Sequence, residues 1–244
     1  MIFDLQKASL LKRASAYLLD IILLVILVAG FAALISEIVD YDSRSTALDE
    51  YYAYYEAKYN VDFDMSAEEF ANMTEAELQK YEAAYNALIT DTEAMQAFSM
   101  LVNLTLIITS FSILFSYVLL EFVVPLIFGN GQTVGKRIFG IAVMRTSGIK
   151  TNGVCLFIRT ILGKYTIETM IPVLMALMIY FGTIGAIGLF ILVLIPLVQI
   201  ILLFANKKHA QIHDLLADTV AVDMASQMIF ENEAAMIAYK NKVQ

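Results

Sequence analysis

The chain has 244 residues, of which 59% are hydrophobic and 16% are charged, and its formal net charge is −8. A soluble domain of this size would carry about 25% charged residues. The composition therefore excludes an ordinary soluble protein and indicates an integral membrane protein, for which no nucleic-acid partner is expected. The single cysteine, Cys155, excludes an internal disulfide and is expected to be a buried thiol.

Three long apolar regions follow one another along the chain. The first, Ala14–Ser36, is too long for the core of a cleavable signal peptide and long enough to cross a bilayer. The second covers Phe98–Leu120 and can continue to residue 128. The third, Ile167–Phe204, is too long for one crossing, and "FGTIG" at Phe181–Gly185 divides it. The sequence therefore predicts four transmembrane helices.

Charge predicts the orientation of these helices. Residues 37–96 hold 15 of the 24 acidic residues but only three of the 16 basic ones. Short basic clusters lie outside this segment: Lys7, Lys12, Arg13, Lys136, Arg137, Arg145, Lys150, Lys207 and Lys208. With four spans all of these clusters fall on one side, which the positive-inside rule makes cytoplasmic. Both termini are then inside the cell, and the acidic segment lies outside.

The acidic segment is rich in tyrosine, alanine and glutamate. "SAEE" at Ser66 and "TEAE" at Thr74 fit the capping-box pattern that begins a helix. They predict two or three helices that form a hairpin outside the membrane. This part is either a small helical cap whose tyrosines pack together or a surface that binds a partner or a cation.

Ionisable residues occur inside or next to the predicted spans. Arg13 and Asp20 are seven residues apart, so they lie on one helix face about 10 Å from each other. An aspartate inside a span costs about 2.5–3.5 kcal/mol on insertion scales, which argues for a role in a structural polar network or in proton or ion handling. Glu121 and Glu168, the latter near Arg159, are expected to be interfacial and either solvated or paired locally.

Two segments predict a small structure on the cytoplasmic side. "TVGKRIFG" favours a short basic interfacial helix. "IAVMR" at Ile141–Arg145 alternates as a strand does, and Thr219–Val222 is the other strand-like run, so the two are expected to pair.

The stretch "KKHAQIHDLLADTVAVD" follows the last span. Lys207 and Lys208 are expected to anchor that span, and "AQIHDLLAD" predicts a short amphipathic helix on which Asp214 and Asp218 share a face. Asp214 is expected to pair with Arg13 or with another basic residue at the inner face. His209 and His213 have a spacing that can chelate, but no third ligand is identifiable, so neither a metal nor another cofactor is expected.

Three motifs in this order resemble the RDD family of bacterial membrane proteins: "KRASAYLLD", "GQTVGKRIFGIAVMR" and "KKHAQIHDLLADTVAV". The family is named for an arginine at the start of its first helix, an aspartate within that helix and a second aspartate. The resemblance assigns these to Arg13, Asp20 and Asp214. It implies transport of an unidentified ligand or sodium/proton exchange, whereas the long acidic insertion departs from the compact family pattern.

The sequence thus predicts an all-α membrane protein with four transmembrane helices, a helical extracytoplasmic insertion and a small cytoplasmic β element. The expected divisions are residues 1–36, 37–97, 98–128, 129–165, 166–205 and 206–244. The expected site is a polar membrane cluster of Arg13, Asp20 and Asp214. Further residues that could contribute to it are Asp218, Glu121, Arg159 and Glu168.

Two functions remain open for a protein of this kind in the cell membrane. One is a transporter or ion/proton exchanger, which four spans would support best in a homo-oligomer. The other is a non-enzymatic scaffold or accessory subunit whose acidic outer part binds a membrane-protein partner. A cavity that reaches Asp20 would favour the first. An enzyme is not expected, because no nucleophile–base pair or metal-ligand set is apparent.

Overall fold

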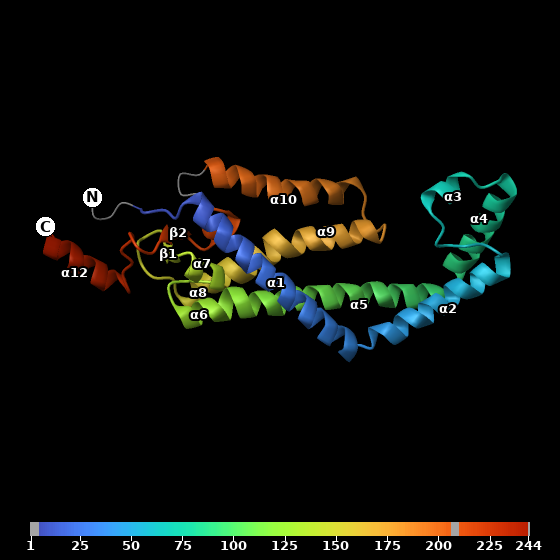
Figure 1. Cartoon of the computed structure of the whole chain (residues 1–244), viewed down its shortest axis with the longest axis horizontal. Helices are drawn as coiled ribbons and strands as arrows, with labels where there is room; N and C mark the ends of the chain where they lie inside the picture. The colour runs from blue at the N-terminus through green and yellow to red at the C-terminus, as the bar shows by residue number, and fades with distance from the viewer. Residues whose placement is uncertain (1–4, 206–209, 244) are drawn as a thin grey trace. The chain divides into compact units, whose positions relative to one another are not determined.

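The computed structural model describes residues 5–205 and 210–243 and is mostly helical (Figure 1). Four helical rods within the described residues are long and apolar enough to cross a membrane: Leu10–Ile38, Thr92–Phe128, Gly153–Tyr180 and Ala186–Ala205. The predictions of four spans and of an all-α membrane fold are therefore confirmed.

Two of the rods are single α-helices, α1 (Leu10–Ile38) and α10 (Ala186–Ala205). The other two each contain a π-helical segment, in which backbone hydrogen bonds join residues five apart. In chain order their parts are α5 (Thr92–Tyr117), η1 (Val118–Val123), α6 (Val124–Phe128), α8 (Gly153–Phe157), η2 (Ile158–Met170) and α9 (Ile171–Tyr180). Segments of this type are rare and are frequently found at functional sites.

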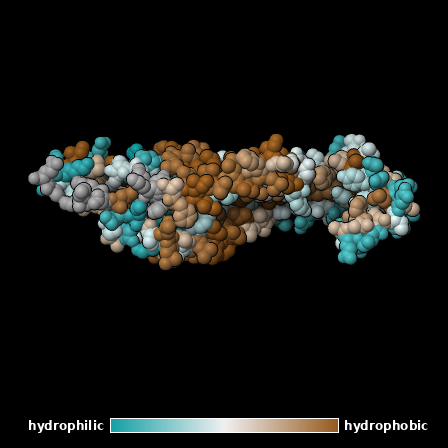
Figure 2. Space-filling model, turned by 90° about the horizontal axis from the view of Figure 1, so that it is seen from above, coloured by the Kyte–Doolittle hydropathy of each residue, from teal (hydrophilic) through white to brown (hydrophobic). Residues whose placement is uncertain are grey.

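The rods carry a largely exposed apolar surface. On α1, for example, Ile26 is 62% exposed, and on α10 Phe204 is 69% exposed. Figure 2 shows apolar side chains over the spanning helices on the face drawn. Such an extended apolar surface is unfavourable in water, and a bilayer removes it from water.

The third span is longer than the sequence predicts. It begins at Gly153 rather than near Ile167, so part of the expected loop of residues 129–165 is helical. Arg159 and Lys164 reduce the mean hydropathy of its first half. A search for apolar runs therefore does not detect this part of the helix. The turn predicted between the third and fourth spans is present, and Gly182 adopts the left-handed conformation there with φ +67°.

A two-stranded antiparallel sheet joins segments far apart in the sequence. Strand β1 (Ile141–Arg145) pairs with β2 (Thr219–Asp223), with Val143 opposite Ala221. The predicted ladder is therefore confirmed. One face of the sheet packs on Ala8 and on Ala16 of α1, and the other is covered by apolar side chains that include Leu5 and Ile229.

Short helices complete this part of the chain: α7 (Val134–Ile138), α11 (Ile212–Leu216) and α12 (Glu233–Val243). Helix α7 is the short helix that "TVGKRIFG" predicts, and α11 is the one predicted after the fourth span. Lys207, Lys208 and His209 lie outside the described residues, so the predicted anchor and the second histidine are not described.

The chain divides into two compact units, residues 1–31 with 110–244 and residues 32–109. The second contains the insertion helices α2 (Tyr41–Tyr59), α3 (Ala67–Ala71) and α4 (Glu75–Thr90). Both predicted capping boxes are present, at Ser66 and Thr74.

Tyrosines form much of the core of the second unit. Tyr55 packs with Leu88 and Ala94, and its hydroxyl donates to Asp91 over 2.8 Å. That hydrogen bond, rather than burial, is the main reason why the pKa of Tyr55 rises to about 12. Tyr59 stacks on Tyr55. The insertion thus consists of helices whose tyrosines pack together, as one of the two alternatives predicts.

Candidate functional site

A cavity of about 550 Å³ lies within the unit of residues 1–31 and 110–244, and we call it the charged cavity. Its basic lining side chains are Arg13, Lys136, Arg159 and Lys164. Its acidic lining side chains are Asp20, Glu121 and Glu168. These charges come from α1, η1, α7 and η2, so segments spread over most of the sequence create the cavity together.

Asp20 of α1 binds the segment that follows the second span, at Thr133 and Gly135. Its two carboxylate oxygens accept hydrogen bonds from the Thr133 hydroxyl over 2.5 Å and from the Gly135 backbone N–H over 2.7 Å. Thr133 is also the N-cap of α7. The Nζ atom of Lys136 is 3.8 Å from the same carboxylate. Asp20 therefore holds α7 in place as a buried anion that is both hydrogen-bonded and charge-balanced.

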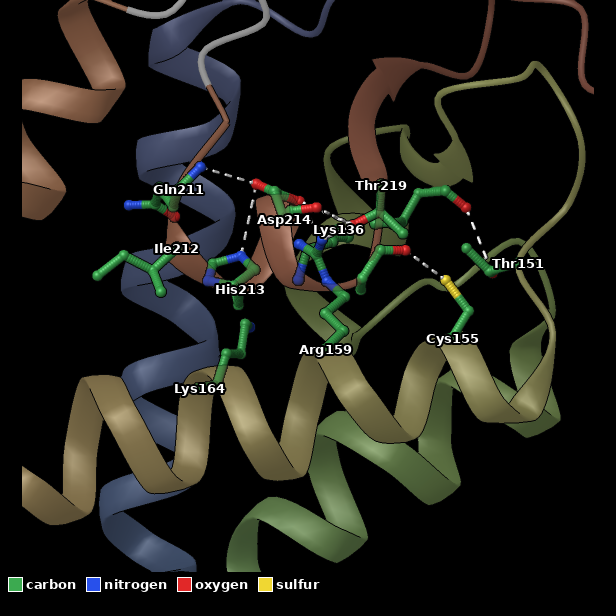
Figure 3. Close-up of polar contacts among 12 residues, drawn as sticks. Lys136, Thr151, Cys155, Arg159, Lys164, Gln211, Ile212, His213, Asp214 and Thr219 are labelled. Carbon is green, nitrogen blue, oxygen red and sulfur yellow. Dashed lines mark hydrogen bonds and ion pairs between the residues drawn. The ribbon is translucent and has the colours of Figure 1, made fainter.

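Asp214 is the centre of a second buried cluster, drawn in Figure 3. Arg159 forms an ion pair with it and also donates to Thr219 over 2.6 Å. Arg13 lies 3.7 Å from its other oxygen. Burial by itself would raise the pKa of Asp214, but the charge of Arg159, followed by His213 and Arg13, outweighs burial and holds that pKa well below its usual range.

The structure brings together only part of the predicted trio directly. Arg13 and Asp214 form an ion pair, whereas the carboxylate of Asp20 contacts α7 and the residue before it. Arg13 and Asp20 nevertheless line the same charged cavity, and Asp214 is fully buried beside His213, which also lines it.

Glu121 pairs with residues distant in the sequence rather than with solvent or near neighbours. It lies 2.6 Å from the Nζ atom of Lys164 and 4.0 Å from that of Lys136. Burial lowers the pKa of Lys136 to about 8, although Glu121 opposes the shift.

Glu168 is also paired at long range. It accepts a 2.8 Å hydrogen bond from the backbone N–H of His213 and lies 2.9 Å from the Nδ1 atom of its ring. This residue therefore joins the third span to α11.

The π-helical geometry of η2 directs three charged side chains into the charged cavity. Arg159 and Lys164 are five residues apart, and in an α-helix they would point about 140° away from each other. A π-helix has more residues in each turn, so residues four and five apart share a face. Arg159, Lys164 and Glu168 consequently all line the cavity. Sequence reasoning based on α-helical periodicity missed this arrangement.

Two glycines permit the close packing around the site. A Cβ atom on Gly135 would lie 2.2 Å from the Ala16 carbonyl oxygen, and one on Gly163 would lie 2.5 Å from the Cβ atom of His213. The absence of a side chain lets α7 approach α1 and lets α11 approach η2. The sequence shows that these residues are glycines but not which segment each one faces.

Asp218 lies outside the cluster, and the prediction that it shares a helix face with Asp214 is wrong. Helix α11 ends at Leu216, and Asp218 adopts a left-handed conformation with φ 49°. Its carboxylate accepts a 2.5 Å hydrogen bond from Thr146 and is exposed. The chain turns here to enter β2, so α-helical spacing no longer applies.

The thiol of Cys155 lies in the interior of the protein. Cys155 is 8% exposed and donates a hydrogen bond to the Ala217 carbonyl. Among residues 5–205 and 210–243, no three histidine, cysteine or acidic side chains are grouped in a way that could hold a metal ion.

Comparison with known protein families identifies the family of this chain. The model of the RDD family matches residues 7–218. The chain belongs to the RDD family. No curated protein and no solved structure matches it. In this RDD protein the family match includes both buried clusters, because Arg13, Asp20, Arg159 and Asp214 all fall within the matched residues.

Proposed function

We propose that this RDD protein transports a ligand that binds in the charged cavity. The observation that carries the proposal is a cavity of about 550 Å³ lined by Arg13 and Asp20 and bordered by candidate membrane spans. Ionisable groups within a span are costly and usually face a bundle interior or a solute pathway. A purely structural ion network would need no such space beside it.

The orientation that we propose follows from charge. Residues 37–96 carry 15 acidic and three basic residues, whereas basic clusters precede the first span, lie between the second and third spans and follow the fourth. The positive-inside rule then puts the sheet and both termini in the cytoplasm and the insertion helices outside the cell membrane.

This orientation predicts which cysteines an impermeant maleimide labels on intact cells. In a Cys155→Ala background, Glu68→Cys in α3 is expected to react at once, and Ser226→Cys is expected to react only after the membrane is breached. Both positions are exposed, so accessibility of the side chain does not distinguish them. The opposite pattern of labelling would refute the orientation.

Flux through proteoliposomes tests the transport proposal. Purified protein should carry its ligand across the bilayer down an imposed gradient, with sodium ions, protons, small solutes and phospholipids tested in turn. Ala14 lines the cavity and is exposed, so Ala14→Phe fills space without disturbing a packed core. We expect Ala14→Phe to remove most of the flux and Ala29→Phe, exposed further along α1, to leave it unchanged. Equal flux in both variants would refute a pathway through the cavity.

A scaffold or accessory role is the second candidate. It is favoured by the insertion helices α2, α3 and α4, whose segment, residues 37–96, packs around tyrosines and contains 15 of the 24 acidic residues of the chain. In this proposal the protein acts without catalysis and binds a membrane-protein partner or a second copy of itself. Absence of flux for every solute, with the protein folded, would favour it.

A further inference from the structure

The charged cavity has an apolar part as well as a charged part. Side chains of α1 and α10 form the apolar walls: Tyr17, Ile21, Leu24, Ile195, Ile200 and Leu203. Tyr17 is 61% exposed and Ile200 is 55% exposed, so both walls continue onto the outer surface of their helices. A ligand that fills this space must therefore be amphipathic, with a polar group among the charges and an apolar group between α1 and α10.

The charged part has an available hydrogen-bond donor. Of the three N–H groups of Lys136, one donates to Thr133 over 3.1 Å, and among the described residues its nearest carboxylates are at 3.8 Å and 4.0 Å. The acidic residues of the lining already accept short hydrogen bonds of 2.5–2.8 Å, from Thr133 to Asp20, from Lys164 to Glu121 and from His213 to Glu168. The site thus offers the ammonium group of Lys136 as a donor to an anion.

The depth of the cavity corresponds to one leaflet of a bilayer. Its lining on α1 extends from Leu10 to Leu24, a length of about 21 Å at 1.5 Å per residue. Half of a bilayer with its headgroups is about 20–22 Å thick. Arg13 lies near the end of this length that is at the membrane surface, and Leu24 and Ile195 lie at the opposite, apolar end.

We infer that the ligand of the charged cavity is a membrane lipid with an anionic phosphate headgroup. Its phosphate oxygens accept hydrogen bonds from Lys136, and an acyl chain lies between α1 and α10. This inference rests on the proposed function only in taking the cavity as the ligand site, and lipid binding is measured without any flux.

Native mass spectrometry of the delipidated, full-length protein tests the inference. Phosphatidylglycerol is expected to bind at least about tenfold more tightly than phosphatidylcholine. Both lipids have the phosphate, but the choline cation of phosphatidylcholine cancels its net negative charge and would lie among the basic side chains of the cavity. Soluble glycerol phosphate, which lacks the acyl chains, is expected to show no binding at the same concentration. Equal binding of the two lipids would overturn the anionic headgroup, and binding of glycerol phosphate as tight as that of phosphatidylglycerol would overturn the lipid.

Matched variants locate the site. Lys136→Gln is expected to weaken phosphatidylglycerol binding about tenfold. Lys150→Gln removes the same charge from a partly exposed lysine that pairs with Glu231 outside the cavity, and it is expected to have no effect. Ala14→Phe should weaken both lipids by blocking the chain. Lipid binding that is unchanged in Lys136→Gln and Ala14→Phe would refute this site, whereas lipid binding without flux would refute only transport.

The pH gives an independent readout of Lys136, whose ammonium group lies near Asp20, Glu121, Lys164 and Arg159. Because its pKa is about 8, affinity for phosphatidylglycerol should fall as the pH rises through about 8, where the donor loses its charge. The phosphodiester itself does not titrate in that range. Lys136→Arg should retain affinity at higher pH. A flat profile in the unmodified protein would contradict a contact to Lys136.

Discussion

The variant Asp214→Ala is expected to lower the free energy of unfolding by about 3–5 kcal/mol, the range for removing one partner of a buried ion pair. The cause is not the lost attraction alone. Arg159 is 4% exposed and Arg13 lies 3.7 Å from the same carboxylate, so the variant leaves both guanidinium groups without this counter-charge. Equilibrium unfolding in mixed detergent micelles measures the loss.

Controls separate this effect from loss of a negative charge in general. Glu231→Ala breaks an ion pair with Lys150 whose acidic side chain is 74% exposed, and it should cost less than about 1 kcal/mol. The double variant Arg159→Met/Asp214→Leu should lose less stability than the sum of the single variants, because it removes the buried charges together. Additive losses would contradict the pairing.

The same pair gives a pH dependence with a defined sign. The pKa of Asp214 is lowered in the folded protein, so its stabilising contribution is fully present at neutral pH, above the unfolded-state value. It is lost as the pH falls from about 4, the unfolded-state value, toward the depressed folded-state pKa. The Asp214→Ala variant should lack this part of the acid-side loss.

The second large effect is expected for Gly135→Ala. The new methyl group would lie 2.2 Å from the Ala16 carbonyl oxygen and 2.9 Å from a carboxylate oxygen of Asp20, so α7 must move away from α1. Overpacking typically costs about 1–3 kcal/mol. Displacing the Gly135 N–H from a buried carboxylate adds about 1.5–3 kcal/mol. Thermal unfolding and the protease sensitivity of the segment around α7 measure the change.

Gly30→Ala is the matched control for this steric prediction. Gly30 lies in α1, and nothing is within 4 Å of the position of an added Cβ atom. Alanine there should change stability by less than about 1 kcal/mol, in the stabilising direction, because it restricts the unfolded chain. If the two alanine variants were equally stable, close contact between α7 and α1 would be disproved.

Asp20→Asn examines the same contact from the other side. An asparagine amide can still accept from the Gly135 N–H and donate to the Thr133 oxygen, so its loss of stability should be smaller than that of Gly135→Ala. If Asp20 also handles protons, this variant remains folded and loses pH-dependent flux.

The features that the sequence predicted are those specified by adjacent residues. Continuous apolar runs predicted the four spans, because a helix buried in lipid needs apolar side chains all around it. Ser66 and Thr74 predicted helix starts, because a capping box is complete within four residues. The ladder between Ile141–Arg145 and Thr219–Val222 was predictable because these are the only strand-like runs in the predicted cytoplasmic segments. Their backbone N–H and C=O groups can hydrogen-bond to each other.

Other features depend on pairs of residues that are distant in the chain, and only the tertiary structure decided them. Arg159 and Lys164 lower the hydropathy of the third span, yet they are buried because Asp214 and Glu121 neutralise them. The π-helical turns of η2, the fit of Gly163 against His213 and the exit of Asp218 from the cluster likewise follow from packing. Burial of a charge is favourable only when its partner is already in place, and a local sequence pattern does not specify that partner.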